Sequence, residues 1–315
     1  MPAPLLEYHQ LQRLGRPGKW RPIVGAPLMV FATFVLAPLG ALVPVMAWLI
    51  VTGEPVGAGL DSVLDLDNVT PLGLAYVNLV LASAIPSAIL VSLAIHGLGP
   101  GWLMSVARRI RWRFFVACLG LSVVALIATV VVSSVVPQAG GTELTGEANS
   151  FTSTTRDFLL VVLLLTPLQA AGEEFAFRGY LMQAFGGLFG SRVMAVLLTS
   201  LLFALAHGIG QDLPIFVDRF AFGLVAGTLV ILTGGLEAGI AMHVLNNFLA
   251  FGLALAFTDM SSALNPTGGT WWSLPGTLTQ SLVYLVLATW TARRMGLRRS
   301  VPADGGLVRD PGGDS

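Results

Sequence analysis

Charged residues, lysine and cysteine are all scarce in this chain of 315 residues. Asp, Glu, Lys and Arg make up 11% of it, against about 25% in soluble domains. Basic and acidic residues balance at 17 each, so there is no excess positive charge for binding nucleic acid. Lys19 is the single lysine and Cys118 the single cysteine. One cysteine excludes an intrachain disulfide and a cluster of thiolate metal ligands.

Apolar residues dominate the composition instead. They account for 55% of the chain, and the mean hydropathy is +0.79. A membrane-spanning helix needs about 20 apolar residues, and the sequence holds eight such runs. We therefore predict an all-α, polytopic integral membrane protein with about eight transmembrane helices, whose partner is a lipid bilayer. The predicted spans are residues 23–51, 72–95, 114–136, 158–176, 193–209, 214–233, 236–257 and 278–292.

The distribution of arginine predicts how these spans are oriented. Arginines cluster before the first span, in the loop at 108–113 and after the last span. The charged residues of the first loop are instead all acidic. Loops rich in Arg and Lys stay in the cytoplasm, so we predict a multi-pass protein of a cell membrane, a bacterial inner membrane, with both termini cytoplasmic. The predicted parts are a cytoplasmic N-terminal segment (1–22), N-terminal transmembrane helices (23–136), a core that carries the polar motifs (157–257), a last transmembrane helix (276–299) and a disordered cytoplasmic tail (300–315).

Three charged residues interrupt the fourth apolar run: Glu173, Glu174 and Arg178. Ionisable residues inside a bilayer are rare and mark functional sites. Glu174 and Arg178 are four residues apart, so they share a helix face and can pair. Glu173 lies about 100° further round the helix. It has no local partner in the sequence, and we expect its partner on another helix.

Further polar residues interrupt the later runs. His207 follows Phe203 by one helical turn, and His243 precedes Asn247 by one turn, with Asn246 as the alternative amide at a spacing of three. Phe203 is expected to pack in the core and to form a wall of the site. If Glu173, His207, His243 and Asn247 converge, a carboxylate and an imidazole can activate water. The second imidazole and the amide can then stabilise an oxyanion.

The same residues allow a metal site as a second interpretation. Glu173, His207 and His243 would form a zinc ligand set with an open fourth position, and Glu174 would then be the base. The spacing H-E-x-x-H is absent, so the sequence does not require a metal. Asp218 and Arg219, which follow Pro214 closely, are expected at the membrane interface.

The three motifs "EEFAFR", "FALAH" and "HVLNN" occur in this order in apolar segments. Together they resemble the CPBP intramembrane proteases, the CAAX-processing and bacteriocin-processing (Abi) family. The resemblance implies an intramembrane endopeptidase that cuts a peptide or a membrane protein. It also implies a role for each residue. Glu173 would be the essential glutamate, His207 its water-holding partner, and His243 and Asn247 the oxyanion side, supported by Glu174 and Arg178. A mechanism without metal is the expectation, with Zn²⁺ as the alternative.

Two other functions fit part of the pattern. A secondary transporter would use Glu and His as a proton relay, and a catalytically silent scaffold or immunity protein would keep only the fold. One geometric difficulty stands against convergence. Counting along the predicted spans puts Glu173 towards the inner side and His207 towards the outer end. Helix five must begin deeper than 193, or the helices must be tilted or broken.

Overall fold

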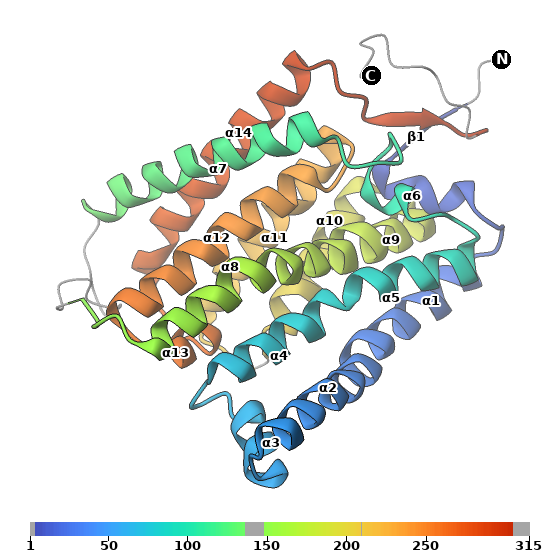
Figure 1. Ribbon diagram of the computed structural model, residues 1–315. Coiled ribbons are helices and arrows are strands. Elements are labelled where there is room, and N and C mark those ends of the chain that lie inside the picture. Colours follow the sequence, from blue (N-terminus) through green and yellow to red (C-terminus); the bar gives the residue numbers. More distant parts are fainter. Residues whose placement is uncertain (1–3, 136–147, 209, 305–315) are drawn as a thin grey trace.

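The computed structural model describes residues 4–135, 148–208 and 210–304. Most of these residues are helical, and most of the helices lie alongside one another in one bundle (Figure 1). The prediction of an all-α polytopic membrane protein is confirmed. The α-helices are α1 Trp20–Phe31, α2 Ala37–Thr52, α3 Val56–Leu64, α4 Pro71–Ala82, α5 Ala84–Val91, α6 Gly101–Met104, α7 Trp112–Ser133, α8 Ser153–Glu174, α9 Met182–Phe189, α10 Arg192–Ala206, α11 Leu213–Thr233, α12 Glu237–Phe257, α13 Met260–Leu264 and α14 Leu274–Arg294. Three segments are π-helical (η2 Ala32–Leu36, η3 Ser92–His96, η4 Phe175–Leu181), two are 3₁₀-helical (η1 Tyr8–Leu14, η5 Trp271–Ser273), and the strands are β1 Leu5–Glu7 and β2 Ser300–Pro302.

Six helical runs within the described residues are long and apolar enough to cross a membrane, against about eight predicted spans. They are Trp20–Thr52, Pro71–His96, Trp112–Ser133, Ser153–Phe189, Leu213–Thr233 and Glu237–Phe257. The predicted fifth span corresponds to α10, which has only 15 residues. The predicted eighth span corresponds to α14, which has 21 residues but carries several Thr, Ser and Gln side chains. Val136 and Ile209, at the ends of two predicted spans, lie outside the described residues.

The longest helical run extends slightly further than predicted. The fourth span was predicted at 158–176, with the helix continuing past Arg178 towards Phe185 until "GGLFGSR" breaks it. The helix does continue, through η4 and α9 to Phe189, and the run contains 37 residues. It ends at Gly190, which has a φ of 70°. This left-handed conformation suits glycine and stops the helix. Ser191 then caps α10 by accepting a hydrogen bond from the backbone N–H of Met194. Residues 153–206 therefore form a helical hairpin.

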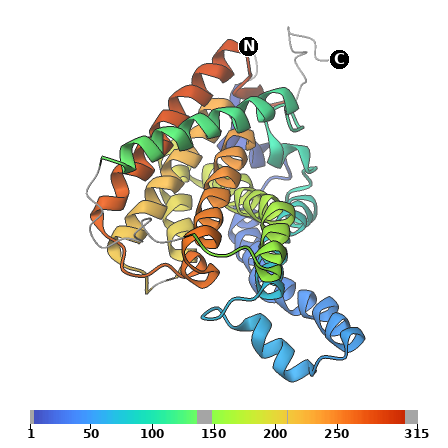
Figure 2. The ribbon, with the colours of Figure 1, turned by 60° about the vertical axis from the view of Figure 1, so that its left-hand side comes forward.

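Helices α2 and α3 stand apart from the rest of the bundle (Figure 2). Figure 2 shows α2 and α3 extending away from the other helices. A small apolar cluster of its own, which includes Val45, Leu49 and Val63, joins them to α4. The main core instead connects α1 with α5, η4 and the later helices.

Both ends of the described chain meet at one end of the bundle (Figure 1). Strands β1 and β2 pair antiparallel there, with Leu6 opposite Val301. The predicted disordered tail (300–315) is therefore wrong at its start, because Ser300–Pro302 is paired. Residues 305–315 of that tail lie outside the described residues. Next to β1, η1 packs against α9, and the Tyr8 hydroxyl donates a hydrogen bond to the carbonyl oxygen of Leu103.

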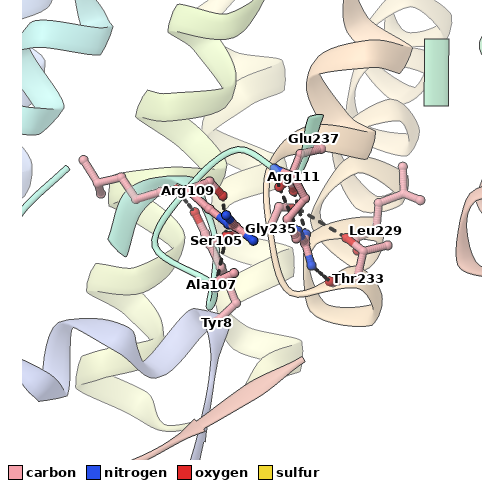
Figure 3. Close-up of polar contacts among 10 residues, drawn as sticks. Tyr8, Ser105, Ala107, Arg109, Arg111, Leu229, Thr233, Gly235 and Glu237 are labelled. Carbon is pink, nitrogen blue, oxygen red and sulfur yellow. Dashed lines mark hydrogen bonds and ion pairs between the residues drawn. The ribbon is translucent and has the colours of Figure 1, made fainter. Parts of the chain in front are cut away.

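A buried ion pair closes the same end of the bundle (Figure 3). Arg111 precedes α7, and Glu237 is the first residue of α12. The Arg111 guanidinium donates to both Glu237 oxygens at 2.8 and 2.6 Å and to the Thr233 carbonyl oxygen at 2.8 Å. The Arg111 backbone N–H donates to the same carboxylate at 2.9 Å. Glu237 is fully buried, so the pair links the first half of the chain to the second without water.

Removing one partner of this pair is expected to destabilise the protein strongly. Glu237→Gln leaves the Arg111 charge without a counter-charge in a buried place, which costs about 3–5 kcal/mol. The double variant Arg111→Met/Glu237→Leu is expected to recover part of that stability, because no lone charge remains. Melting temperatures in detergent test both expectations. Asp157→Asn is the control, since the Arg156–Asp157 pair is exposed and such pairs contribute about 0–1 kcal/mol. Equal melting temperatures for Glu237→Gln and this control would contradict the prediction.

Candidate active site

The hairpin formed by residues 153–206 brings Glu173 and His207 to the same level. Glu173 precedes Phe189 by about 16 residues, and His207 follows Arg192 by about 15, which at ~1.5 Å per residue gives about 24 and 22 Å from the turn. The two arms run antiparallel from Gly190, so the side chains face the same depth of the bundle. The difficulty seen in the sequence disappears because the fourth helix is longer than predicted.

A fully buried ion pair lies beneath the site. One Glu174 oxygen, Oε1, accepts hydrogen bonds from Arg178 Nη1 and from His243 Nδ1, both at 3.0 Å. Glu174 and Arg178 have no exposed surface. The other carboxylate oxygen, Oε2, has no hydrogen-bond partner among the described residues. It lies where a Cβ on Gly239 would come within 2.8 Å, so α12 passes Glu174 with only a glycine between them.

Phe203 connects this ion pair to the two histidines. The Arg178 guanidinium lies 4.2 Å from the centre of the Phe203 ring, where the negative face of the ring attracts a cation. The same ring makes edge contacts with His207 and His243, at 4.6 and 5.9 Å between centres. Phe203 is thus both a core residue and a wall of the site, the two roles expected of it.

Glu173 has a local partner that we did not expect from the sequence. Gln169, one turn earlier in α8, donates from Nε2 to Glu173 Oε1 at 2.7 Å. The expectation that Glu173 lacks a partner on its own helix is therefore wrong. Gln169 Oε1 accepts in turn from Asn247 Nδ2 at 2.9 Å, so the glutamine joins the carboxylate to the amide on α12. Glu173 Oε2 accepts no hydrogen bond from a described residue and lies 3.5 Å from His243 Nε2.

His207 occupies the opposite wall and has a defined tautomer. Its Nδ1 lies 2.8 Å from the Phe203 carbonyl oxygen. A carbonyl oxygen only accepts, so Nδ1 carries the proton and the neutral ring has an acceptor at Nε2. The His207 side chain is exposed, in contrast to the buried Glu173 and His243. The carbonyl of His207 accepts from Arg219 Nη1 at 3.4 Å.

The four predicted catalytic residues line one cavity of about 400 Å³, together with Gln169, Phe203, Asp218, Arg219 and Asn246. Glu173 and His207 also border a smaller hollow of about 120 Å³ on the side of η2. Asn246, the alternative amide, accepts a hydrogen bond from Gln280 of α14 at 3.2 Å, so Asn247 is the amide that faces Glu173. The cavity is large enough for a short peptide segment and holds an acceptor carboxylate beside two imidazoles.

Sequence reasoning missed Gln169, Asp218 and Arg219 as parts of this cavity. Gln169 carried a usable signal, because it precedes Glu173 by four residues and shares its helix face. Asp218 and Arg219 were expected at the membrane interface, which stays a prediction, and the structure adds that both line the cavity. Their position depends on how α11 packs against α10, which the sequence does not show.

Comparison with known proteins finds a family that matches the segment carrying this site. Residues 155–249 match the family described as type II CAAX prenyl endopeptidase Rce1-like. The CPBP resemblance is confirmed. The Rce1-like segment begins in the first turn of α8 and ends within α12, so it contains Glu173, Glu174, Arg178, Phe203, His207, His243 and Asn247. The rest of the chain lies outside the match.

Two curated relatives align with part of the chain. The "Uncharacterized protein YyaK" of Bacillus subtilis (strain 168) is 28% identical over 145 residues, which cover 42% of this chain and 48% of the relative. The "Uncharacterized 24.3 kDa protein" of Escherichia coli is 33% identical over 87 residues, covering 27% and 39% respectively. The chain thus spans less than half the length of either relative.

Both histidines of the site are oriented through Nδ1. His243 uses Nδ1 on Glu174, and His207 uses Nδ1 on a backbone carbonyl, so both rings keep Nε2 for another partner. Among the described residues, no group of three His, Cys, Asp or Glu side chains is placed to hold a metal ion in this arrangement. The alternative zinc set of Glu173, His207 and His243 stays a prediction.

The close passage of Gly239 across Glu174 leads to a prediction on stability. Gly239→Ala places a methyl group against Oε2 of a carboxylate that Arg178 and His243 already hold, so the side chain cannot move aside without breaking a bond. Such overpacking typically costs about 1–3 kcal/mol. Gly252→Ala on the same helix meets nothing within 4 Å and should gain up to about 1 kcal/mol of helix propensity. Melting temperatures of the two variants are expected to move in opposite directions, and a shared direction would contradict the prediction.

Proposed function

We propose that this protein is an intramembrane endopeptidase in which Glu173 activates water to hydrolyse a peptide bond. One observation carries the proposal. The free oxygen of Glu173 lies at the wall of a cavity, 3.5 Å from His243 Nε2, while Gln169 holds its other oxygen. A carboxylate with one bonded and one free oxygen is oriented to accept a proton from water.

The proposed reaction starts with a water molecule between Glu173 Oε2 and His207 Nε2, the two acceptors that face the cavity. Glu173 takes a proton as the water oxygen attacks the peptide carbonyl carbon, and the carbonyl electron pair moves to its oxygen. The protonated Glu173 then gives that proton to the departing amine when the C–N bond breaks. Both steps use the same oxygen, so the carboxylate is regenerated.

The oxyanion needs donors, and α12 supplies them. His243 Nδ1 donates to Glu174, and a carboxylate there allows Nε2 to carry a proton as well, since it balances the imidazolium charge. Asn247 uses one amide N–H on Gln169 and keeps a second for the oxyanion.

The expected loss of activity differs between the paired glutamates. Glu173→Gln keeps the shape but removes the proton acceptor, so the cleavage rate is expected to fall by about 10²–10⁴-fold at an unchanged melting temperature. Glu174→Gln instead leaves Arg178 without a counter-charge, which costs about 3–5 kcal/mol of stability and lowers the cleavage rate only in part. Glu174→Gln/Arg178→Leu should recover some stability. Cleavage of reporter peptides in liposomes and melting in detergent measure both effects. A Glu174→Gln variant that is as inactive as Glu173→Gln at wild-type stability would make Glu174 the base.

The same assay addresses zinc and transport. We propose a reaction without metal, so activity should persist in strong chelator. If the chelator removes stoichiometric zinc together with the activity, and added zinc restores the activity, then Glu173, His207 and His243 would be zinc ligands. Transport of a substrate without cleavage would favour the proton-relay transporter. The absence of both cleavage and transport would favour a silent scaffold.

Gln169 is expected to act through Glu173 and Asn247. Gln169→Met keeps the volume and removes both hydrogen bonds, so we expect cleavage to fall about 10–100-fold through kcat, with about 1–3 kcal/mol lost in stability. Combined with Asn247→Ala, it should cause little further loss, because contacting residues are coupled by about 0.5–3 kcal/mol. Gln280→Met is the control, an equally buried glutamine that bonds Asn246. Additive effects of Gln169→Met and Asn247→Ala would show that the glutamine has only a packing role.

The substrate we propose is a peptide or a segment of a membrane protein, in a bacterial inner membrane with both ends of the protein in the cytoplasm. The arginine-rich segments support this orientation. Reporter fusions after Arg113 and Arg299 are expected to read cytoplasmic, and a fusion after Asp67 to read extracytoplasmic. An extracytoplasmic reading after Arg299 would require an odd number of spans.

A further inference from the structure

Two charged residues of the cavity, Asp218 and Arg219, have no part in the proposed water attack. Both lie on α11 and line the cavity of about 400 Å³ that contains Glu173. Arg219 is engaged by its surroundings, because Nη1 donates to Gln211 Oε1 at 2.7 Å and to the His207 carbonyl oxygen. It therefore braces the loop that follows α10.

Asp218 is in the opposite situation. Its Oδ1 is buried and has no hydrogen-bond partner among the described residues. A buried carboxylate oxygen without a donor is costly. Thr277, at the start of α14, lines the same cavity and lies close enough to the Asp218 carboxylate to interact with it. Its single hydroxyl also donates to the Ser273 carbonyl oxygen at 3.3 Å, so Asp218 keeps room for a further donor. The position therefore suits a donor that arrives with a ligand.

The cavity extends towards the end of the bundle away from the paired strands. Its lining includes Leu66, Ala263, Leu264 and Thr277. Ala263 and Leu264 lie at α13, which is at the opposite end of the bundle from β1 in Figure 1. The other end carries the Arg111–Glu237 pair and η1.

Asp218 precedes Phe222 by four residues, which is one helical turn of α11. Phe222 contacts the ring of His243, with 5.2 Å between the ring centres. One turn of helix is about 5.4 Å, which matches roughly two residues of an extended peptide at ~3.3 Å each. A group bound at Asp218 would therefore belong to a residue about two or three positions from the scissile bond.

We propose that Asp218 forms a specificity subsite for a cationic group, an ammonium or guanidinium, on the peptide substrate. The inference rests on the proposed function and adds a substrate class to it: peptides with a basic residue near the cleavage site, entering from the end of the bundle opposite to the chain ends. The cation donates to the unpartnered Oδ1 and balances the carboxylate charge within the cavity.

The test is cleavage of synthetic peptides by the full-length protein in phosphatidylglycerol vesicles. N-acetylated peptides carry Lys, norleucine or Glu at each position, and mass spectrometry locates the cuts. The wild type should prefer Lys over norleucine at one position two or three residues from the cut. Asp218→Asn should lower that ratio about tenfold, equivalent to about 1.4 kcal/mol. Asp218→Lys should shift the preference to Glu. Asp212→Asn is the matched control, since Asp212 caps the same helix region outside the cavity and accepts from Gly268 and Gly269.

Each other outcome overturns a specific claim. An unchanged Lys-to-norleucine ratio in Asp218→Asn and Asp218→Lys, with cleavage intact, removes the subsite and leaves the protease. Cleavage that survives Glu173→Gln removes the proposed function and the subsite with it. Dependence on Asp218 that appears only when the peptide N-terminus is free assigns the terminal amine instead of a side chain. Dependence that appears only after phosphatidylethanolamine is added assigns the carboxylate to a lipid headgroup, and the peptide subsite falls.

Discussion

The buried guanidinium of Arg178 is the constraint on which the rest of the site depends. A charge with no exposed surface needs compensation, and it comes from Glu174 one turn earlier and from the face of the Phe203 ring on α10. The His243 ring on α12 donates to the same Glu174 oxygen. These contacts hold α8, α10 and α12 together at one point. Gly239 follows from the same constraint, because a larger residue would push α12 away from the carboxylate.

The overall fold was accessible from the sequence because its signal is local. Apolar runs and arginine-rich loops predict spanning helices without knowledge of their neighbours, and each predicted span has a counterpart among the helices. The errors are at places where a local signal is weak. The helix through Arg178 ends at Phe189, a few residues beyond the predicted Phe185. Ser300–Pro302 looks unstructured by composition but pairs with β1.

The candidate site likewise has contacts that the sequence predicts and contacts that it does not predict. Helical spacing was enough to pair Glu174 with Arg178 and His243 with Asn247, since residues four apart meet on any helix. The bridge from Asn247 through Gln169 to Glu173 requires two helices in one register, and the place of Asp218 in the cavity requires a third. Such contacts between helices depend on packing angles that no single segment encodes. The roles of the side chains, as opposed to their positions, remain those that the family resemblance implies.

The pairing of β1 with β2 has a consequence for biogenesis. Leu5–Glu7 is synthesised before the spanning helices of the described residues, whereas its partner Ser300–Pro302 is synthesised after them. The strand must stay unpaired throughout synthesis, and η1, which follows it, packs on α9 from the middle of the chain. The order of assembly is therefore from the inside outwards. The hairpin of residues 153–206 can form early. Strands β1 and β2 pair last, so their pairing requires that the helices between them have already been inserted.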